Sequence, residues 1–217
     1  MQNSKSITIL GAGGGAISIQ NHIIKADSFN ANFIAISGDK YCLQKSLAQN
    51  KIQITSFNGL GSPQPEYYSE GAKNSSEQIV KAINCSNILF LLVCMGGANG
   101  TGIAPVVAKL AKDMGIFIVS IVTKPFLFEG QRRVEKAEAG IVELLKSSNE
   151  LFVFNLNDIL KNSVIKISNY NKSSDVQFDL SFENETTDNL ELSNCFEKAN
   201  EITHRALIIL TEKYDSF

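Results

Sequence analysis

The 217-residue chain has little of what several common sites and functions require. Its net charge is only −2, so its overall charge does not favour nucleic acid or an anionic membrane surface as a partner. Its four cysteines form no C-x-x-C pair and have no histidine at ligand spacing. This pattern argues against a zinc site and favours reduced thiols.

Long apolar segments are also missing. The longest apolar run, from Ile88 to Met95, is far too short to span a bilayer, and no apolar core follows the first residues as in a secretory signal. We therefore expect a cytoplasmic protein without membrane insertion. Its apolar content of 44% is ordinary for a globular protein, and its length is sufficient to bury a core.

Short apolar segments alternate with helical patterns along residues 1–161. Strands are expected at residues 6–10, 32–37, 51–54, 87–93, 116–122 and 151–154. Helices are expected directly after the first strand and at residues 75–82, 103–114 and 129–147. This alternation predicts a doubly wound α/β domain, with a mainly parallel sheet covered by helices on both faces. Such domains bind ligands beyond the carboxyl ends of their strands.

The pattern changes after residue 161. Residues 162–190 are rich in Asn, Ser, Asp and Lys, which predicts an irregular insertion, with a short hairpin as the alternative. Apolar residues then recur at helical spacing from Leu192 to Leu210. We therefore expect residues 191–217 to form a long terminal helix packed on the same domain.

A first glycine-rich turn, GAGGGA at residues 11–16, lies between the first strand and its helix. Glycine permits a close backbone approach, and a helix start offers free N–H groups to an anion, so this turn favours phosphate over simple packing. The spacing Gly11-x-Gly13-x-x-Ala16 also fits a dinucleotide-binding fingerprint, with Asp39 as a ribose ligand. An NAD(P)-binding Rossmann oxidoreductase therefore stays open as an alternative.

A second glycine-rich turn, MGGANGTG at residues 95–102, again follows an apolar strand and opens a helix. Two such turns suit a nucleotide with several phosphates, whereas a dinucleotide enzyme needs only one. No lysine follows the glycines, so this is not a Walker loop. Backbone N–H groups, two helix dipoles and bound magnesium would then balance the phosphate charge.

Several blocks together resemble the tubulin/FtsZ family. Residues 94–108, CMGGANGTGIAPVVA, resemble its signature loop and helix, and residues 121–133, IVTKPFLFEGQRR, resemble a further FtsZ block. Shorter matches lie at residues 59–61, 155–158 and 196–201, in the family's order. The resemblance covers nearly the whole chain outside residues 162–190. It implies a shortened, divergent GTP-binding domain without the second FtsZ domain.

The resemblance also implies a site for GTP or GDP, with Mg²⁺ held mainly through the phosphates. Its implied residues are Gly13, Gly14, Gly15 and Ser18 in the first loop, Gly61 and Ser62 near the γ-phosphate, and Gly97, Asn99, Gly100, Thr101 and Gly102 in the second loop. Glu129 is implied at the ribose, Arg133 and Asn157 beside the nucleotide, Phe196 stacked on guanine, and Asn200 and Glu201 at the guanine edge. From the residues alone, Phe196 is equally compatible with core packing, and Glu129 and Arg133 with a solvated helix face. No catalytic side chain or metal ligand is assigned.

The implied role is a cell division protein, cytoplasmic or at the division site, that joins, caps or modulates filaments by binding full-length FtsZ or by self-association. The family's N-x-D-x-x-D loop is missing from the sequence, which implies very slow hydrolysis by the chain alone. Ile17, Ser18, Ala98 and Asn99 depart from the family pattern, with Asn99 standing at a family threonine. A degenerate remnant that binds no nucleotide is therefore a further alternative.

Overall fold

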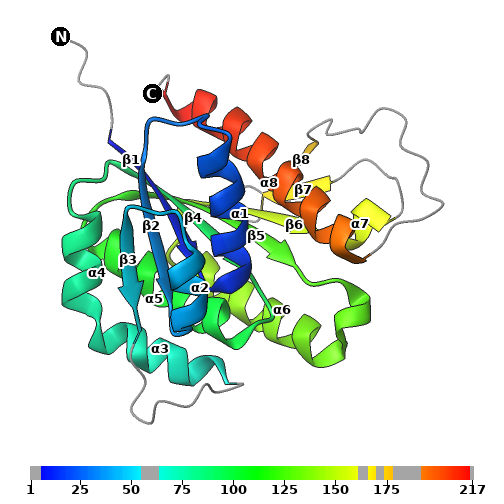
Figure 1. The fold of residues 1–217 in the computed structure, drawn as a ribbon, viewed down its shortest axis with the longest axis horizontal. Helices are drawn as coiled ribbons and strands as arrows, with labels where there is room; N and C mark the ends of the chain where they lie inside the picture. The colour runs from blue at the N-terminus through cyan, green and yellow to red at the C-terminus, as the bar shows by residue number, and fades with distance from the viewer. Residues whose placement is uncertain (1–5, 55–63, 161–165, 170–173, 178–191, 216–217) are drawn as a thin grey trace.

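The computed structural model describes residues 6–54, 64–160, 166–169, 174–177 and 192–215. These residues form a sheet in the order β3-β2-β1-β4-β5-β6-β7-β8 (Figure 1). The parallel strands are β1 (Ile7–Ala12), β2 (Asn32–Ser37), β3 (Asn50–Gln53), β4 (Ile88–Cys94), β5 (Phe117–Lys124) and β6 (Glu150–Asn155). β7 (Lys166–Asn169) and β8 (Ser174–Gln177) extend the sheet in antiparallel pairing.

The sheet is covered by helices on both faces, which confirms the predicted α/β class. One face packs against α1 (Gly14–Lys25), α2 (Lys40–Lys45) and α8 (Leu192–Asp215). The other packs against α3 (Pro65–Asn74), α4 (Ser76–Ile83), α5 (Ala98–Asp113) and α6 (Gln131–Leu145). The short η1 (Leu127–Glu129) and α7 (Asn157–Leu160) follow β5 and β6.

Side-chain alternation along the strands builds the two cores. Phe90 and Leu92 of β4 face the α1 and α8 side, whereas Leu89, Leu91 and Val93 face the α5 side. Since both faces are buried, the strand is apolar throughout, as expected for a parallel sheet between helices. Figure 1 shows α8 lying beside α1 on one face of the sheet, and the two helices are in contact.

The start of α5 differs from the prediction. The helix was expected from Ile103, but it begins at Ala98, inside the glycine cluster. A Cβ on Gly100 would lie 2.7 Å from the Ala12 carbonyl oxygen, and one on Gly102 would lie 2.0 Å from the Pro65 carbonyl oxygen. These glycines therefore permit close packing of a helical turn, whereas their low helix propensity suggested a loop.

Besides the short η1 and α7, the helices α2 and α3 were not predicted from the sequence. α3 begins with Pro65 at its first turn, a position that proline favours; its buried residues are the small Gly71 and Ala72, and the helix packs against α5. α2 is only one and a half turns long and is capped by Asp39. Neither helix has the broad apolar stripe from which longer helices are recognised.

Within the segment that was predicted to be irregular, at residues 162–190, the structure describes β7 and β8. They pair with each other, as in the hairpin alternative. In the part of the chain that the structure describes, every helix is too short or too polar to cross a membrane.

Candidate functional site

The strand order reverses between β1 and β4, and the helices that follow these strands cover opposite faces of the sheet. In doubly wound sheets the crevice at this reversal, beyond the carboxyl ends of the strands, is the usual ligand site. A cavity of about 390 Å³ lies there. The predicted residues that line it are Gly13, Gly14, Gly15, Ser18, Gly97, Asn99, Gly100, Glu129, Arg133, Phe196 and Asn200.

The first glycine turn is held close to the second. Gly13 has a φ of +83°, which favours glycine, and its N–H donates to the Ile36 carbonyl oxygen (2.9 Å). A Cβ on Gly13 would lie 2.7 Å from the backbone nitrogen of Gly100. The backbones of the two turns are therefore in contact, and a side chain at this point would force them apart.

The second glycine turn places the start of α5 at the same cavity. Gly97 is the residue before the first helical turn, and its backbone has an extended conformation that any residue can adopt. The N–H of Gly96 donates to Oγ1 of Thr101 (3.0 Å), which ties the turn to the helix. A Cβ on Gly97 would meet nothing within 4 Å, in contrast to Gly13 and Gly100.

The two helix starts give this part of the cavity a positive potential. The first N–H groups of a helix have no partner within the helix, and the helix dipole places a partial positive charge there. Neither α1 nor α5 has an acidic residue in its first turn to offset that charge. Cys94 also lines the cavity, and burial raises the pKa of its thiol to about 11, so the thiol is neutral at physiological pH.

A carboxylate and two cations line the other side of the cavity. Phe126 N–H donates to one Glu129 oxygen (2.9 Å), and the Arg133 guanidinium pairs with the other. Only 12% of the Glu129 side chain is exposed, compared with 53% for Arg133. A carboxylate has about four lone-pair sites, so Glu129 keeps acceptor capacity for hydroxyl donors. Lys124, the second cation, pairs with Glu138 (2.6 Å).

An aromatic cluster stands beside this carboxylate. Phe126 is fully buried, Phe128 stacks on it with ring centroids 4.9 Å apart, and Phe196 meets it edge-on at 5.4 Å. Phe196 is 46% exposed and lines the cavity, so plain core packing does not describe it. Asn200, one turn along α8, donates a long hydrogen bond to Ser18 of α1 (3.5 Å).

Four of the predicted residues lie away from the cavity. Asn157 braces the turn before Glu129: its Oδ1 accepts from Leu127 N–H (2.8 Å) and its Nδ2 donates to the Pro125 carbonyl (3.3 Å). Glu201 is exposed and is not among the lining residues. Thr101 and Gly102, the remaining two, line a different hollow on the far side of the first turn of α5.

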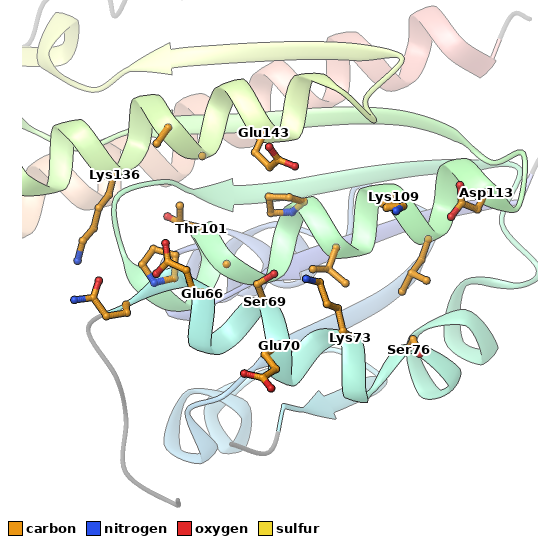
Figure 2. Close-up of a pocket in the computed structure, with 18 residues that line it drawn as sticks. Glu66, Ser69, Glu70, Lys73, Ser76, Thr101, Lys109, Asp113, Lys136 and Glu143 are labelled. Carbon is orange, nitrogen blue, oxygen red and sulfur yellow. The ribbon is translucent and has the colours of Figure 1, made fainter. Parts of the chain in front are cut away.

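This second hollow is a groove of about 1110 Å³ between α3 and α6, with α5 as its floor. Figure 2 shows Thr101 in the groove, near Glu66 and Ser69 of α3. Four acidic and three basic side chains line the groove, so it has no dominant charge. Gly61 and Ser62, which were predicted near the γ-phosphate, lie outside the described residues.

Some lining residues were not assigned to the nucleotide site from the sequence. They are Ala12, Ile19, Cys94, Met95, Ala98, Thr123, Lys124, Pro125, Leu156 and Ala199. Lys124 and Pro125 stand inside the block at residues 121–133 that carries the family resemblance, so their positions were available as a signal. Ile17, a departure from the family pattern, packs into the core at 2% exposure and does not fill the cavity.

Asp39, the ribose ligand of the dinucleotide alternative, has another role in this structure. Its Oδ1 accepts from Tyr41 N–H (2.8 Å) and caps α2, and it lies outside the set of cavity-lining residues. The hydrogen bond from the Cys42 thiol is the main cause that lowers the pKa of this carboxyl group; desolvation opposes it, and the backbone N–H groups of Tyr41 and Cys42 lower the pKa further. The cap explains the aspartate at the end of β2 without a dinucleotide.

The described residues include no cluster of three or more His, Cys, Asp or Glu side chains that could hold a metal ion. The free N–H groups at the two helix starts beside the cavity suit an anion.

Comparison with known proteins gives relatives in one family. A model of the tubulin/FtsZ family GTPase domain matches residues 6–164. The cell division protein FtsZ of Rickettsia felis is 40% identical over 151 residues, which are 68% of this chain and 33% of the relative. FtsZ of Rickettsia prowazekii is 39% identical over the same lengths. The chain thus spans about a third of the length of these relatives.

Solved structures agree with this match. An empty FtsZ dimer from M. jannaschii has a TM-score of 0.82 at 29% identity, covering 98% of this chain and 56% of that chain. A GTPgS-bound CetZ2 protofilament from Haloferax volcanii shares the fold, with a TM-score of 0.74 at 16% identity over 94% of this chain and 57% of that one. From the match over residues 6–164, the chain belongs to the tubulin/FtsZ family and carries its GTPase domain.

Proposed function

We propose that the cavity between the two glycine turns binds the phosphates of GTP or GDP. The observation that carries this proposal is the contact between Gly13 and Gly100, at which two helix starts from opposite faces of the sheet meet beside one cavity. Several N–H groups and two dipoles converge there without an acidic side chain in either first turn, an arrangement suited to a polyanion.

The rest of the nucleotide would extend from the phosphates towards α8. Glu129 has free acceptor sites for the ribose hydroxyl groups, and the exposed ring of Phe196 offers an apolar face for the base. Asn200 supplies an amide that can pair with the base edge. Arg133 lines the same side, whereas Asn157 supports it through the turn at Pro125 and Leu127.

Magnesium would enter with the nucleotide and be held mainly by its phosphate oxygens. Mg²⁺ commonly keeps several water ligands and binds through substrate phosphates, so it needs no protein cage. The ion would neutralise phosphate charge that the N–H groups leave unbalanced.

Calorimetric titration with GTP, GDP, ATP and NAD in magnesium buffer tests this function. We expect GTP and GDP to bind with similar affinity, since both carry the phosphates nearest the two turns, and ATP to bind more weakly. Tight binding of NAD with no response to GTP would favour the oxidoreductase alternative. If neither GTP nor GDP gives a heat of binding at millimolar concentration, the result would favour the alternative of a degenerate remnant that binds no nucleotide. Ile17 lies in the core, which removes one reason for that second alternative.

We also propose that the protein takes part in cell division in the cytoplasm, by self-association or by joining filaments of full-length FtsZ. Its relatives are named cell division proteins, and the M. jannaschii relative is described as a dimer. Leu127 and Phe128 expose apolar surface next to the aromatic cluster, which would suit a protein partner. Sedimentation with and without full-length FtsZ tests this role. If the protein neither enters polymers nor changes their length, the proposed role is ruled out.

Hydrolysis by these 217 residues alone should be slow. None of them forms the N-x-D-x-x-D motif to which the family resemblance assigns the positioning of the attacking water, and phosphoryl transfer depends on such positioning. Phosphate release should therefore stay near the uncatalysed rate with GTP alone and rise only when full-length FtsZ is added.

A further inference from the structure

The carboxyl end of β2 is connected to both glycine turns. The N–H of Gly13 in the first turn donates to the Ile36 carbonyl oxygen (2.9 Å). In the second turn, Asn99 Nδ2 donates to Ser37 Oγ (2.8 Å), and Gly38 N–H donates to Asn99 Oδ1 (3.1 Å). Both parts of the cavity are therefore fixed to the same three residues, 36–38.

The connection through Asn99 uses both polar atoms of its amide. Ser37 is fully buried, and its hydroxyl also accepts from Asp39 N–H (3.0 Å), so it is held in place when Asn99 reaches it. Asn99 itself is half-buried in the first turn of α5, next to Gly100. A threonine, which the family pattern has here, carries no amide and cannot donate and accept through two separate terminal atoms.

We propose that Asn99 is a positioning residue that fixes the start of α5 to β2 and thereby sets the distance between the two phosphate-binding turns. This inference rests on the proposed nucleotide function and deepens it. Asn99 would act through Ser37 and Gly38, and the phosphates would meet the backbone N–H groups of its turn. Asn99 would then fix the turn in place of the family threonine, through its own hydrogen bonds.

A double-mutant cycle with Asn99→Ala, Ser37→Ala and the double variant tests the proposal, with GTP and GDP affinities measured by calorimetry in magnesium buffer. Each single variant should weaken both nucleotides by about fivefold to twentyfold, from the loss of one or two buried hydrogen bonds. The double variant should bind about as well as the weaker single variant, because both changes break the same connection. Titrations are run well below the unfolding temperature of each variant.

Asn149→Ala is the matched control. Its amide also fixes a strand, accepting from Ile118 N–H (2.8 Å), but at the amino end of β5, away from the cavity. It should lower the unfolding temperature with unchanged affinity. The amide signal of Gly38 gives an independent readout: it should shift on nucleotide binding in the wild type, and shift much less in Asn99→Ala.

The possible outcomes separate the two proposals. Unchanged affinity in Ser37→Ala, with weaker binding in Asn99→Ala, would mean that the bond between Asn99 and Ser37 does not set the position of the turn, and would overturn the positioning role proposed for this connection alone. Multiplicative losses in the double variant would overturn it as well. A wild-type protein that binds neither GTP nor GDP would overturn the nucleotide function, and the positioning role with it.

Discussion

Substitution of Gly97 by valine gives the sharpest test of where the phosphates bind. The residue lines the cavity at the start of α5, and its φ of −80° and ψ of 139° suit a β-branched side chain. A Cβ there meets nothing within 4 Å, so the valine would occupy empty cavity space. The fold should therefore tolerate the change, whereas nucleotide binding should become weaker.

The magnitudes follow from the same geometry. A phosphate oxygen must come within about 3 Å of a backbone N–H, and a valine side chain at this point would keep it away. Losing one charge-assisted hydrogen bond, at about 1.5–3 kcal/mol, weakens binding by about tenfold to a hundredfold, and losing two weakens it by about a hundredfold or more. The free energy of unfolding should fall by only about 1 kcal/mol, because valine is a poorer helix N-cap than glycine.

Calorimetry with GTP and thermal unfolding are the two assays, and Gly100→Ala is the contrasting variant. Its Cβ would lie 2.7 Å from the Ala12 carbonyl oxygen, so it should destabilise the fold by about 1–3 kcal/mol and lower the unfolding temperature clearly. If Gly97→Val binds GTP as tightly as the wild type, the phosphates do not lie against this turn and the proposed site is wrong.

Three further predictions concern the other parts of the site. Phe196→Ala should weaken the binding of GTP and GDP by the same factor, about fivefold or more, since stacking of a base on an aromatic ring contributes about 1–3 kcal/mol; a variant that binds both nucleotides as tightly as the wild type in calorimetry would exclude the stacking role. Asn157→Ala should lower both the unfolding temperature and the affinity, because the turn at Leu127 loses its 2.8 Å bond; loss of affinity with full thermal stability would indicate direct contact instead. Burial raises the pKa of the Cys94 thiol from 9.0 to about 11, so the folded state favours the neutral thiol and deprotonation at high pH favours unfolding. The free energy of unfolding should fall by about 2–3 kcal/mol between pH 9 and pH 11, and Cys94→Ser in chemical denaturation should show a smaller fall.

Much of the architecture was accessible from the sequence. The strands at residues 32–37, 87–93 and 116–122 were predicted within two residues of the observed ends, because buried parallel strands are apolar throughout. The two glycine turns, which were expected to hold the phosphates of one nucleotide, follow β1 and β4, the two strands between which the order reverses. Eleven of the predicted residues line the cavity, including both turns and the α8 residues Phe196 and Asn200.

The parts that could not be predicted depend on contacts between distant segments. Nothing local to Asn99 indicates that its amide reaches Ser37, because the partner is 62 positions away. Thr101 and Gly102 were assigned to the nucleotide by motif alone, but the turn of a helix sends Asn99 and Gly100 to one hollow and Thr101 and Gly102 to another. The glycines of this motif therefore serve two purposes: Gly100 lies at the cavity, and Gly102 allows close contact with Pro65.

At the cavity, the glycine turns that follow β1 and β4 touch through their main chains, at Gly13 and Gly100, and main-chain N–H groups form this part of the cavity surface. Every amino acid except proline carries the same N–H, so mutation cannot delete these donors by trimming a side chain. A larger side chain at Gly13 or Gly100 would instead block this surface by adding atoms to it. Sequence drift at neighbouring positions, such as Ala98, would leave its chemistry intact, and a lineage could depart far from its ancestral motif before this surface ceased to attract anions.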